Sequence, residues 1–343
     1  MKAVYYVGDL QMQMRDIPVP TPAADEYLLK IDACGVCGSD FEGFLGKTGR
    51  RIAPMIMGHE FAGHVVQAPE GGKYAPGTKA AVFPKLYCGT CETCRRGLVN
   101  LCPNGPFFGV MDCDGAMTEY ICVREQYLIP YDGVDASVAA MAEPAAVAYN
   151  GVSKLSDAEI VAAENILVVG AGTIGLLALL WLKYRGAKRV IVSDATDFRL
   201  ELAKKLGADA TINPATEDFD EAIRRLTDGK LCDASVECVG ITPTAQSSIN
   251  ALTNSGVAVW IGNAAKMVSI DMQRIVTTEL QIRGNYIYSK EDFETCVRLL
   301  SEKAIDVSPI ITHHMPMAEG VEAFERLKNN KDGKAIKIIL VND

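Results

Sequence analysis

The chain has 343 residues, a length that suggests about two domains. Its hydrophobic content of 49% and charged content of 22% are those of a folded protein with an apolar core. Its net charge is −9 and no cluster of Lys and Arg stands out, which argues against nucleic acid as a partner because an acidic surface repels phosphate. This balance suits an enzyme that acts on small molecules.

The first 147 residues contain several short β-like runs separated by Gly, Pro and Asp turns. Frequent short strands with turn signals predict a barrel-like or irregular β domain. The N-terminal segment lacks the long apolar core of a secretion signal, so we expect a cytoplasmic protein whose thiols stay reduced. The strand-like runs are KAVYYV, EYLLKIDA, EFAGHVVQA, KAAVFP and MTEYICV.

After residue 147 the pattern changes to strands that alternate with helices. The strand NILVVG leads into the apolar helix GLLALLWLKYRG, and three further strand–helix pairs follow before the strand VAVWIG. Such alternation predicts a parallel, doubly wound sheet with helices in its crossovers. The 17 uncharged residues 166–182 fall short of a membrane-spanning helix, so we expect no membrane segment.

A glycine-rich turn joins the first of these strands to its helix. It reads Gly170-Ala171-Gly172-Thr173-Ile174-Gly175, a G-x-G-x-x-G motif in the strand-to-helix context that gives the motif its value. The three glycines permit the tight turn, the close approach of a pyrophosphate and the packing of helix on strand. The phosphates would sit at the helix N-terminus, so the turn predicts a dinucleotide site.

An acidic residue ends the second strand of this region. Asp194 follows Gly175 by 19 residues, where a carboxylate accepts hydrogen bonds from the adenosine ribose hydroxyls. The same charge repels a 2′-phosphate, so NAD is favoured over NADP. Arg199 lies nearby and weakens that preference, because its charge suits a phosphate.

Four cysteines lie close together in the segment CGTCETCRRGLVNLC. Their spacing is C-x2-C-x2-C-x7-C, and four thiolates can enclose one tetrahedral zinc without leaving an open position. Such a site is structural. An iron–sulfur cluster is the rival interpretation, but bacterial ferredoxins place the fourth cysteine closer to the third. The four predicted zinc ligands are Cys88, Cys91, Cys94 and Cys102.

A second set of potential ligands is spread more widely. The segment ACGVCGSDFEGF carries Cys34 and Cys37 in a C-x-x-C spacing that suits a redox dithiol or half of a zinc site. His59 follows 22 residues after Cys37, and Glu143 is a possible third ligand. One Cys, one His and one carboxylate leave a fourth position on zinc for water or substrate, as a catalytic site requires.

Six motifs in order resemble one family, the zinc-dependent medium-chain dehydrogenases, and within it the polyol branch of sorbitol, threonine and galactitol-phosphate dehydrogenases. The resemblance extends over essentially the whole chain, although it is far less specific for the substrate. The motifs are CGVCGSD, GHEFAGHVV, CGTCETCRRGLVNLC, GAMTEYICV, EPAAVAYNGV and GAGTIG.

The resemblance implies a GroES-like β-rich catalytic domain, residues 1–147 and 286–343, and a Rossmann NAD-binding domain, residues 148–285. It implies two zinc ions per chain, a small-molecule alcohol as substrate, and a dimer or tetramer, of which we favour the tetramer. In such a family the active site lies in the cleft between the domains.

Carried over by motif, the resemblance implies that Cys37, His59 and a carboxylate hold the catalytic zinc. The carboxylate is Glu60 or Glu143, and the residues do not decide between them. Ser39 would bond the substrate hydroxyl and relay its proton. Asp40 would support the zinc site, since a carboxylate bonded to a ligating imidazole fixes its orientation. Cys34 would be a bystander.

The chain departs from sorbitol dehydrogenases where these carry an Arg-Tyr pair that touches the polyol. Here Ile287 and Tyr288 stand at that place, and the run KEDFETC that follows is closer to threonine dehydrogenases. Oxidation of a hydroxy amino acid is therefore an alternative. A nucleotide-binding relative without activity and an iron–sulfur electron carrier are the alternatives from other classes. Candidate pocket residues are Phe44, Phe107, Asn285 and Tyr288.

Overall fold

The computed structural model describes residues 1–8, 10–111 and 113–342, and the chain forms two compact units. Unit 1 comprises Met1–Glu143, Ser289–Lys331 and the chain from Ala335 onward; unit 2 comprises Pro144–Tyr288 and Asp332–Lys334. We expected boundaries after residues 147 and 285. The first lies inside one continuous helix, α4 (Ala142–Val152), so no break in periodicity marks it.

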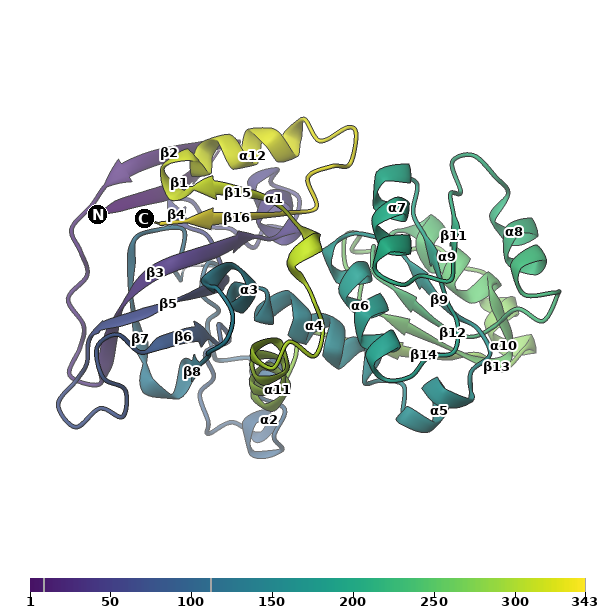
Figure 1. Ribbon diagram of the computed structural model, residues 1–343, viewed down its shortest axis with the longest axis horizontal. Helices are drawn as coiled ribbons and strands as arrows, with labels where there is room; N and C mark the ends of the chain where they lie inside the picture. Colours follow the sequence, from purple (N-terminus) through teal and green to yellow (C-terminus); the bar gives the residue numbers. More distant parts are fainter. Residues whose placement is uncertain (9, 112, 343) are drawn as a thin grey trace. The chain divides into compact units, whose positions relative to one another are not determined.

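Unit 1 is built on a seven-stranded sheet with the order β15-β16-β3-β5-β6-β8, in which β7 also pairs with β3 (Figure 1). A smaller sheet has the order β2-β1-β4. Alternate residues of β3, among them Tyr27, Leu29 and Ile31, are fully buried, which is the period of two expected for a half-buried strand. The C-terminal strand β16 lies between β15 and β3 and so brings the chain end beside the segment that leads to Cys37.

The strands of unit 1 are β1 (Lys2–Gly8), β2 (Gln11–Asp16), β3 (Glu26–Val36), β4 (Met55–Ile56), β5 (Glu60–Gln67), β6 (Lys79–Val82), β7 (Tyr120–Arg124), β8 (Leu128–Pro130), β15 (Ile311–Pro316) and β16 (Lys337–Val341). Its helices are α1 (Gly38–Phe44), α2 (Glu92–Arg95), α3 (Ala136–Ala140), α11 (Lys290–Ser301) and α12 (Gly320–Lys328), with short 3₁₀ turns η1 (Val99–Leu101), η2 (Glu125–Tyr127), η3 (Ser308–Ile310) and η4 (Met317–Glu319).

Unit 2 is a six-stranded parallel sheet with the order β11-β10-β9-β12-β13-β14. This order reverses between β9 and β12, as in dinucleotide-binding folds, and it confirms the predicted doubly wound sheet. Figure 1 shows α6 in front of the sheet and α9 behind it. Leu167 and Val169 of β9 belong to the apolar cluster that also contains Ile223 and Ile249.

The strands of unit 2 are β9 (Ile166–Val169), β10 (Val190–Ser193), β11 (Ala210–Ile212), β12 (Cys232–Glu237), β13 (Leu252–Trp260) and β14 (Gln281–Gly284). Besides α4, its helices are α5 (Asp157–Ala162), α6 (Thr173–Tyr184), α7 (Asp197–Lys205), α8 (Phe219–Leu226), α9 (Thr242–Asn250) and α10 (Met272–Thr277).

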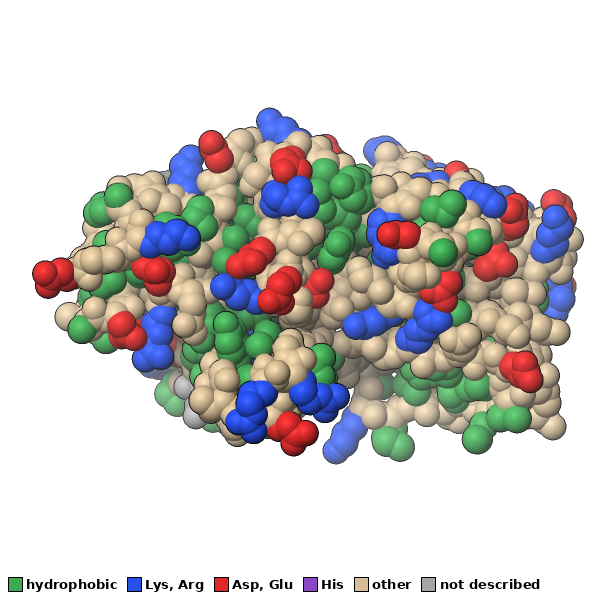
Figure 2. Space-filling model, turned by 90° about the horizontal axis from the view of Figure 1, so that it is seen from below, with side chains coloured by type: hydrophobic (Ala, Val, Ile, Leu, Met, Phe, Trp, Pro, Cys, Tyr) green, Lys and Arg blue, Asp and Glu red, His purple; other side chains and the backbone are tan. Residues whose placement is uncertain are grey.

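Charged side chains of both signs are interspersed on the face drawn in Figure 2. Within the described ranges, no helix combines the length and the apolar character that crossing a bilayer requires.

Candidate metal centres and dinucleotide-binding turn

The end of β3 fixes Cys37 at the start of α1. Its Sγ accepts a hydrogen bond from the backbone N–H of Ser39 at 3.4 Å, and Asp40 Oδ2 accepts one from the backbone N–H of Cys37 at 3.2 Å. These two bonds form a reciprocal N-terminal cap, which fixes the position of the sulfur at the start of the helix. The Ser39 hydroxyl also donates to Cys37 Sγ at 3.3 Å.

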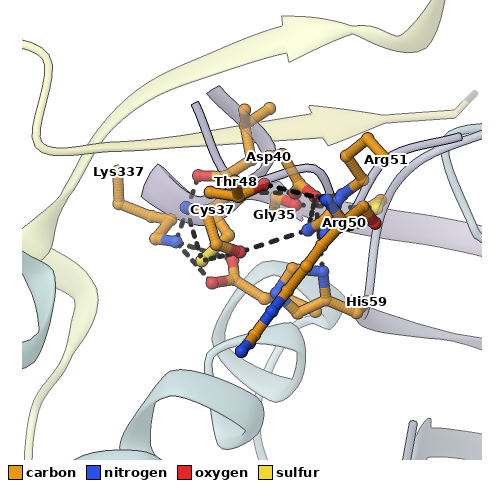
Figure 3. Close-up of polar contacts among 12 residues, drawn as sticks. Gly35, Cys37, Asp40, Thr48, Arg50, Arg51, His59 and Lys337 are labelled. Carbon is orange, nitrogen blue, oxygen red and sulfur yellow. Dashed lines mark hydrogen bonds and ion pairs between the residues drawn. The ribbon is translucent and has the colours of Figure 1, made fainter. Parts of the chain in front are cut away.

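His59 and Glu60 join Cys37 at the start of β5. One ligand atom of each residue lies within 4.8 Å of the others, and His59 is only 5% exposed. Figure 3 shows Cys37 and His59 of this group side by side. The His59 ring packs edge-on against Phe107, with centroids 5.6 Å apart. Its Nδ1 is buried without a hydrogen bond in the described part of the chain, and Asp40 Oδ1 lies 3.5 Å away.

This cluster fits a zinc ion in its chemistry. A thiolate, an imidazole and a carboxylate are the donors that catalytic zinc sites combine, and three protein ligands leave a position for substrate. Asp40 faces His59 Nδ1, which leaves Nε2 as the nitrogen that could bind the metal. A carboxylate on the other ring nitrogen is the usual way in which a ligating imidazole is oriented. Glu143 is also buried, but the group within 4.8 Å contains Glu60 and not Glu143.

The ionisation of the cluster depends on its buried neighbours. Burial alone would raise the pKa of Asp40, but the His59 imidazole and the Arg51 guanidinium more than offset it, so its pKa lies well below the usual range. Burial also opposes the charging of His59, but Asp40 and Cys37 outweigh it and raise the pKa of the imidazole. In the metal-free protein this favours a protonated imidazole, which must lose a proton before His59 can bind a metal.

Lys337 is a member of this cluster that the sequence did not predict. Its fully buried Nζ donates to both Glu60 oxygens, at 2.8 and 2.6 Å, and to Val36 O at 3.2 Å. Gly35 leaves room for the carboxylate, because a Cβ at that position would overlap Glu60 Oε2. The signal available in the sequence is a lysine that begins the otherwise apolar strand KIILV.

The four predicted cysteine ligands lie together and make a second candidate metal centre. Their Sγ atoms lie within 4.8 Å of one another, and the separations Cys88–Cys94, Cys91–Cys102 and Cys88–Cys102 are 3.9, 3.9 and 3.6 Å. A tetrahedron with Zn–S bonds of about 2.3 Å has edges of about 3.8 Å. Backbone N–H groups of Thr90 and Cys91 lower the pKa of Cys88 to about 5, so it is ready to act as a thiolate.

Lys85 lies beside this centre and was also not predicted. Its side chain donates to Cys102 O at 3.1 Å and to Gly105 O at 2.6 Å. The buried cation thus links Lys85 to the segment Cys102–Gly105, and its charge partly balances the negative charge of the thiolates.

The glycine-rich turn has the geometry of a dinucleotide site. Gly170 adopts a φ of 96°, and a Cβ on Gly175 would overlap Gly170 O, so both positions require glycine. A Cβ on Gly172 would meet no atom within 4 Å, so the turn is open to a ligand there. Gly172 caps α6, which begins with Thr173 and Ile174.

Asp194 is bonded directly to this turn. Its Oδ2 accepts the backbone N–H of Ala171 at 2.8 Å, and its Oδ1 accepts that of Thr196 at 2.9 Å. Arg199 Nη1 lies 3.9 Å from the carboxylate, while Arg199 Nε donates to Gly333 O at 3.3 Å. The carboxylate is therefore fixed at the strand end where a ribose would bind.

The candidate pocket residues differ in their surroundings. Phe44 stacks with Phe41 and packs on Phe324, so it belongs to an aromatic core. Tyr288 is fully buried, and Asn285 Nδ2 donates to Val147 O at 3.4 Å. Phe107 contacts the His59 ring of the predicted metal cluster within unit 1.

Comparisons with known proteins identify the family. An alcohol dehydrogenase GroES-like domain matches residues 23–133, and a zinc-binding dehydrogenase domain matches residues 173–302. L-threonine 3-dehydrogenase of Saccharopolyspora erythraea is 32% identical over 95% of both chains, and sorbitol dehydrogenase of Gallus gallus is 32% identical over 99% of this chain and 95% of its own.

Among solved structures, galactitol-1-phosphate dehydrogenase from Escherichia coli superposes with a TM-score of 0.90 at 27% identity, covering 99% of this chain and 100% of its own. These matches confirm the resemblance drawn from the six motifs and the α/β fold of a GroES-like and a Rossmann domain. The chain therefore belongs to the zinc-dependent medium-chain alcohol dehydrogenases, enzymes that use zinc and a nicotinamide cofactor.

Proposed function

We propose that this protein is an NAD-linked dehydrogenase that interconverts a secondary alcohol of a polyol, a sugar alcohol or a polyol phosphate with the corresponding ketone. The observation that carries the proposal is the group of the partly buried Cys37 and the buried His59 and Glu60 beside the Ser39 hydroxyl. A non-catalytic relative would have no physical need for such a group.

The residues of the chain have separate parts in this reaction. Cys37, His59 and Glu60 hold the metal, with Glu143 as the alternative carboxylate. When bound, zinc would supply Lewis-acid polarisation of the substrate oxygen, and the nicotinamide would supply the hydride acceptor. Ser39 Oγ, 3.3 Å from Cys37 Sγ, takes the proton of the alcohol and passes it towards solvent. Asp40 holds the His59 ring in place.

The named relatives support this range of substrates without choosing within it. They include a sorbitol, a galactitol-1-phosphate and a threonine dehydrogenase. The run KEDFETC keeps L-threonine as the second candidate. Side chains from distant segments shape such a pocket, and a single methylene changes preference only about 10- to 200-fold.

A substrate panel tests the proposal. Polyols, polyol phosphates, hydroxy acids and L-threonine are each supplied with NAD, and the absorbance of NADH is followed. We expect turnover with a polyol or its phosphate and about two zinc ions per chain by elemental analysis. Turnover with no member and only one tightly held zinc would favour the non-catalytic relative. A brown protein would indicate an iron–sulfur centre.

Replacement of Asp194 by asparagine is expected to weaken the preference for NAD. The carboxylate favours ribose hydroxyls and repels a 2′-phosphate, and a hydrogen bond to a charged group contributes about 1.5–3 kcal/mol. The ratio of kcat/KM for NAD to that for NADP should fall by at least about ten-fold. Asparagine keeps one acceptor oxygen, for Ala171 N–H, and loses the one for Thr196 N–H, so the melting temperature is measured beside the ratio to check that the turn survives. An unchanged ratio would show that Asp194 does not select the cofactor.

We further propose that a second copy of the chain covers the edge of the unit 2 sheet. β14 ends the strand order, and its Ile282 is exposed, as are Met272 and Val276 of α10, at 72% and 63%. A bare strand edge invites pairing, and an edge-to-edge dimer would extend the sheet symmetrically. Ile282→Lys should lower the molar mass found by light scattering at least about two-fold. A wild-type monomer would contradict this assignment.

A further inference from the structure

Arg51 has a place in unit 1 that the family resemblance did not assign. Its side chain is 3% exposed and donates to Asp40 Oδ1 from Nη2 at 2.7 Å and from Nε at 3.2 Å. The same Nη2 donates to Ser39 Oγ at 3.2 Å. One guanidinium thus binds two neighbouring side chains of α1, of which Asp40 is labelled beside Arg51 in Figure 3.

Each of these two acceptors touches a different proposed metal ligand. Ser39 Oγ lies 3.3 Å from Cys37 Sγ, and Asp40 Oδ1 lies 3.5 Å from His59 Nδ1. Asp40 Oδ1 is the same oxygen that Arg51 binds, so the guanidinium fixes the carboxylate on the side that faces the imidazole. The other oxygen, Oδ2, is held by the backbone N–H of Cys37.

The fold makes room for Arg51 and holds its backbone. A Cβ on Gly43 would overlap Arg51 Cγ, so this glycine inside α1 accommodates the arginine stem despite its cost to the helix. The segment is bonded to the loop that carries Met111, since Met111 N–H donates to Arg50 O at 2.8 Å. Arg51 Nη1 also donates to Arg50 O, at 3.3 Å. The side chain is therefore fixed by its surroundings.

The hydrogen bond from Arg51 also directs the Ser39 hydroxyl. Because Nη2 donates to Oγ, the hydroxyl hydrogen points elsewhere, and in the structure it is donated to Cys37 Sγ. A lysine could replace the charge, but an ammonium is a compact donor and lacks the planar fork that reaches two acceptors at once.

We propose that Arg51 is a positioning residue that couples the two halves of the metal centre: it holds Asp40 against His59 and turns the Ser39 hydroxyl toward the metal side of Cys37. The assignment rests on the proposed function only in taking Cys37 and His59 as metal ligands. It adds a residue to the site whose effect is transmitted through Asp40 and Ser39.

Two substitutions and one control test this assignment. Arg51→Met removes both hydrogen bonds, Arg51→Lys keeps the charge, and Arg124→Met removes an exposed guanidinium from the same unit. Each protein is prepared with zinc and, separately, with cobalt at the catalytic site, whose visible absorption reports the ligand geometry. Zinc content and melting temperature are measured for all.

We expect Arg51→Met to lower kcat about 10- to 100-fold, the range found when partners of metal ligands are removed, with KM changed less than about three-fold. Its cobalt spectrum should shift because the His59 ring loses its fixed carboxylate. Arg51→Lys should recover the melting temperature but not kcat. Arg124→Met should match the wild type in every readout.

Other results would overturn the proposal. If Arg51→Lys restores kcat fully, the charge alone matters and the bridging geometry does not. If folded, metal-loaded Arg51→Met keeps the wild-type spectrum and kcat, Arg51 has no positioning role. Should Arg51→Met fail to fold, the kcat and the cobalt spectrum of Arg51→Lys decide the question. If the wild type oxidises no alcohol, the proposed function fails, while the cobalt spectrum still tests Arg51.

Discussion

Replacement of Cys37 by alanine is expected to lower turnover by at least about 10³-fold while the protein stays folded. Loss of the thiolate removes a metal ligand, and the polarisation that the ion gives to a substrate oxygen contributes several kcal/mol, of which each 1.36 kcal/mol is a factor of about ten. The side chain is not part of the apolar core, but it caps α1, so the metal-free variant should lose only about 0.5–2 kcal/mol of stability and stay folded. Activity, zinc content and thermal unfolding are measured together.

Cys34→Ala is the matched control, because it removes the other sulfur of the same C-x-x-C. Cys34 is fully buried in β3, where it pairs with Phe61 and Leu340, and burial raises the pKa of its thiol well above the usual value. The variant should cost about 1 kcal/mol of stability as a small cavity and keep activity within about three-fold. Zinc loss equal to that of Cys37→Ala would show that the two sulfurs share one role.

The features that the sequence predicted are those whose partners lie close together along the chain. The four cysteines of the closed centre span residues 88–102, and the glycine turn spans residues 170–175. In both cases all the residues that form the site lie in one short segment, so their spacing along the sequence is enough to predict it. The strands of unit 2 were also predicted, because buried parallel strands read as continuous apolar runs between helices.

The features that the sequence did not predict depend on contacts across the fold. Lys337 meets Glu60 across 277 positions, and it does so only because β16 lies between β15 and β3. Arg51 and Lys85 looked like ordinary loop cations. β14, with the sequence QIRG, was missed because it carries one apolar residue and owes its conformation to backbone pairing with β13. The choice between Glu60 and Glu143 was likewise a matter of packing.

Replacement of Lys337 by methionine is expected to lower the free energy of unfolding of the metal-free protein by about 3–5 kcal/mol, because it leaves the Glu60 carboxylate buried without its cation. The lysine pKa is raised: burial lowers it, but Glu60 and Cys37 outweigh burial. The contribution of the charged lysine to the free energy of unfolding is therefore complete below pH 10.5, the ordinary lysine pKa, and is lost only as the pH rises above that value. Urea unfolding of chelator-treated protein at neutral pH measures the effect.

Lys2→Met is the control for this loss of charge. Lys2 also lies on a strand of unit 1 and pairs with Asp16, but the two side chains are 50% and 74% exposed, and such pairs contribute little. Its unfolding free energy should stay within about 0.5 kcal/mol of the wild type. The double variant Lys337→Met/Glu60→Gln should recover part of the loss, because it removes the stranded charge. Equal stability of Lys337→Met and Lys2→Met would contradict the assigned role of the buried pair.

Zinc binding then distinguishes Glu60 from Glu143 as the carboxylate ligand, a choice that the sequence did not decide. In Lys337→Met, Glu60 is free of its cation, and if it is the metal ligand it can give its full charge to the ion. Zinc should in that case narrow the stability gap between variant and wild type by at least about 1 kcal/mol, since a ligand that binds only the folded state stabilises it. If Glu143 is the ligand instead, Glu60 stays unpaired after zinc is added and the gap keeps its full size. Zinc titration of Glu143→Gln tests the same choice from the other side. If Glu60 is the ligand, the zinc affinity of Glu143→Gln should equal that of the wild type; if Glu143 is the ligand, the affinity should fall.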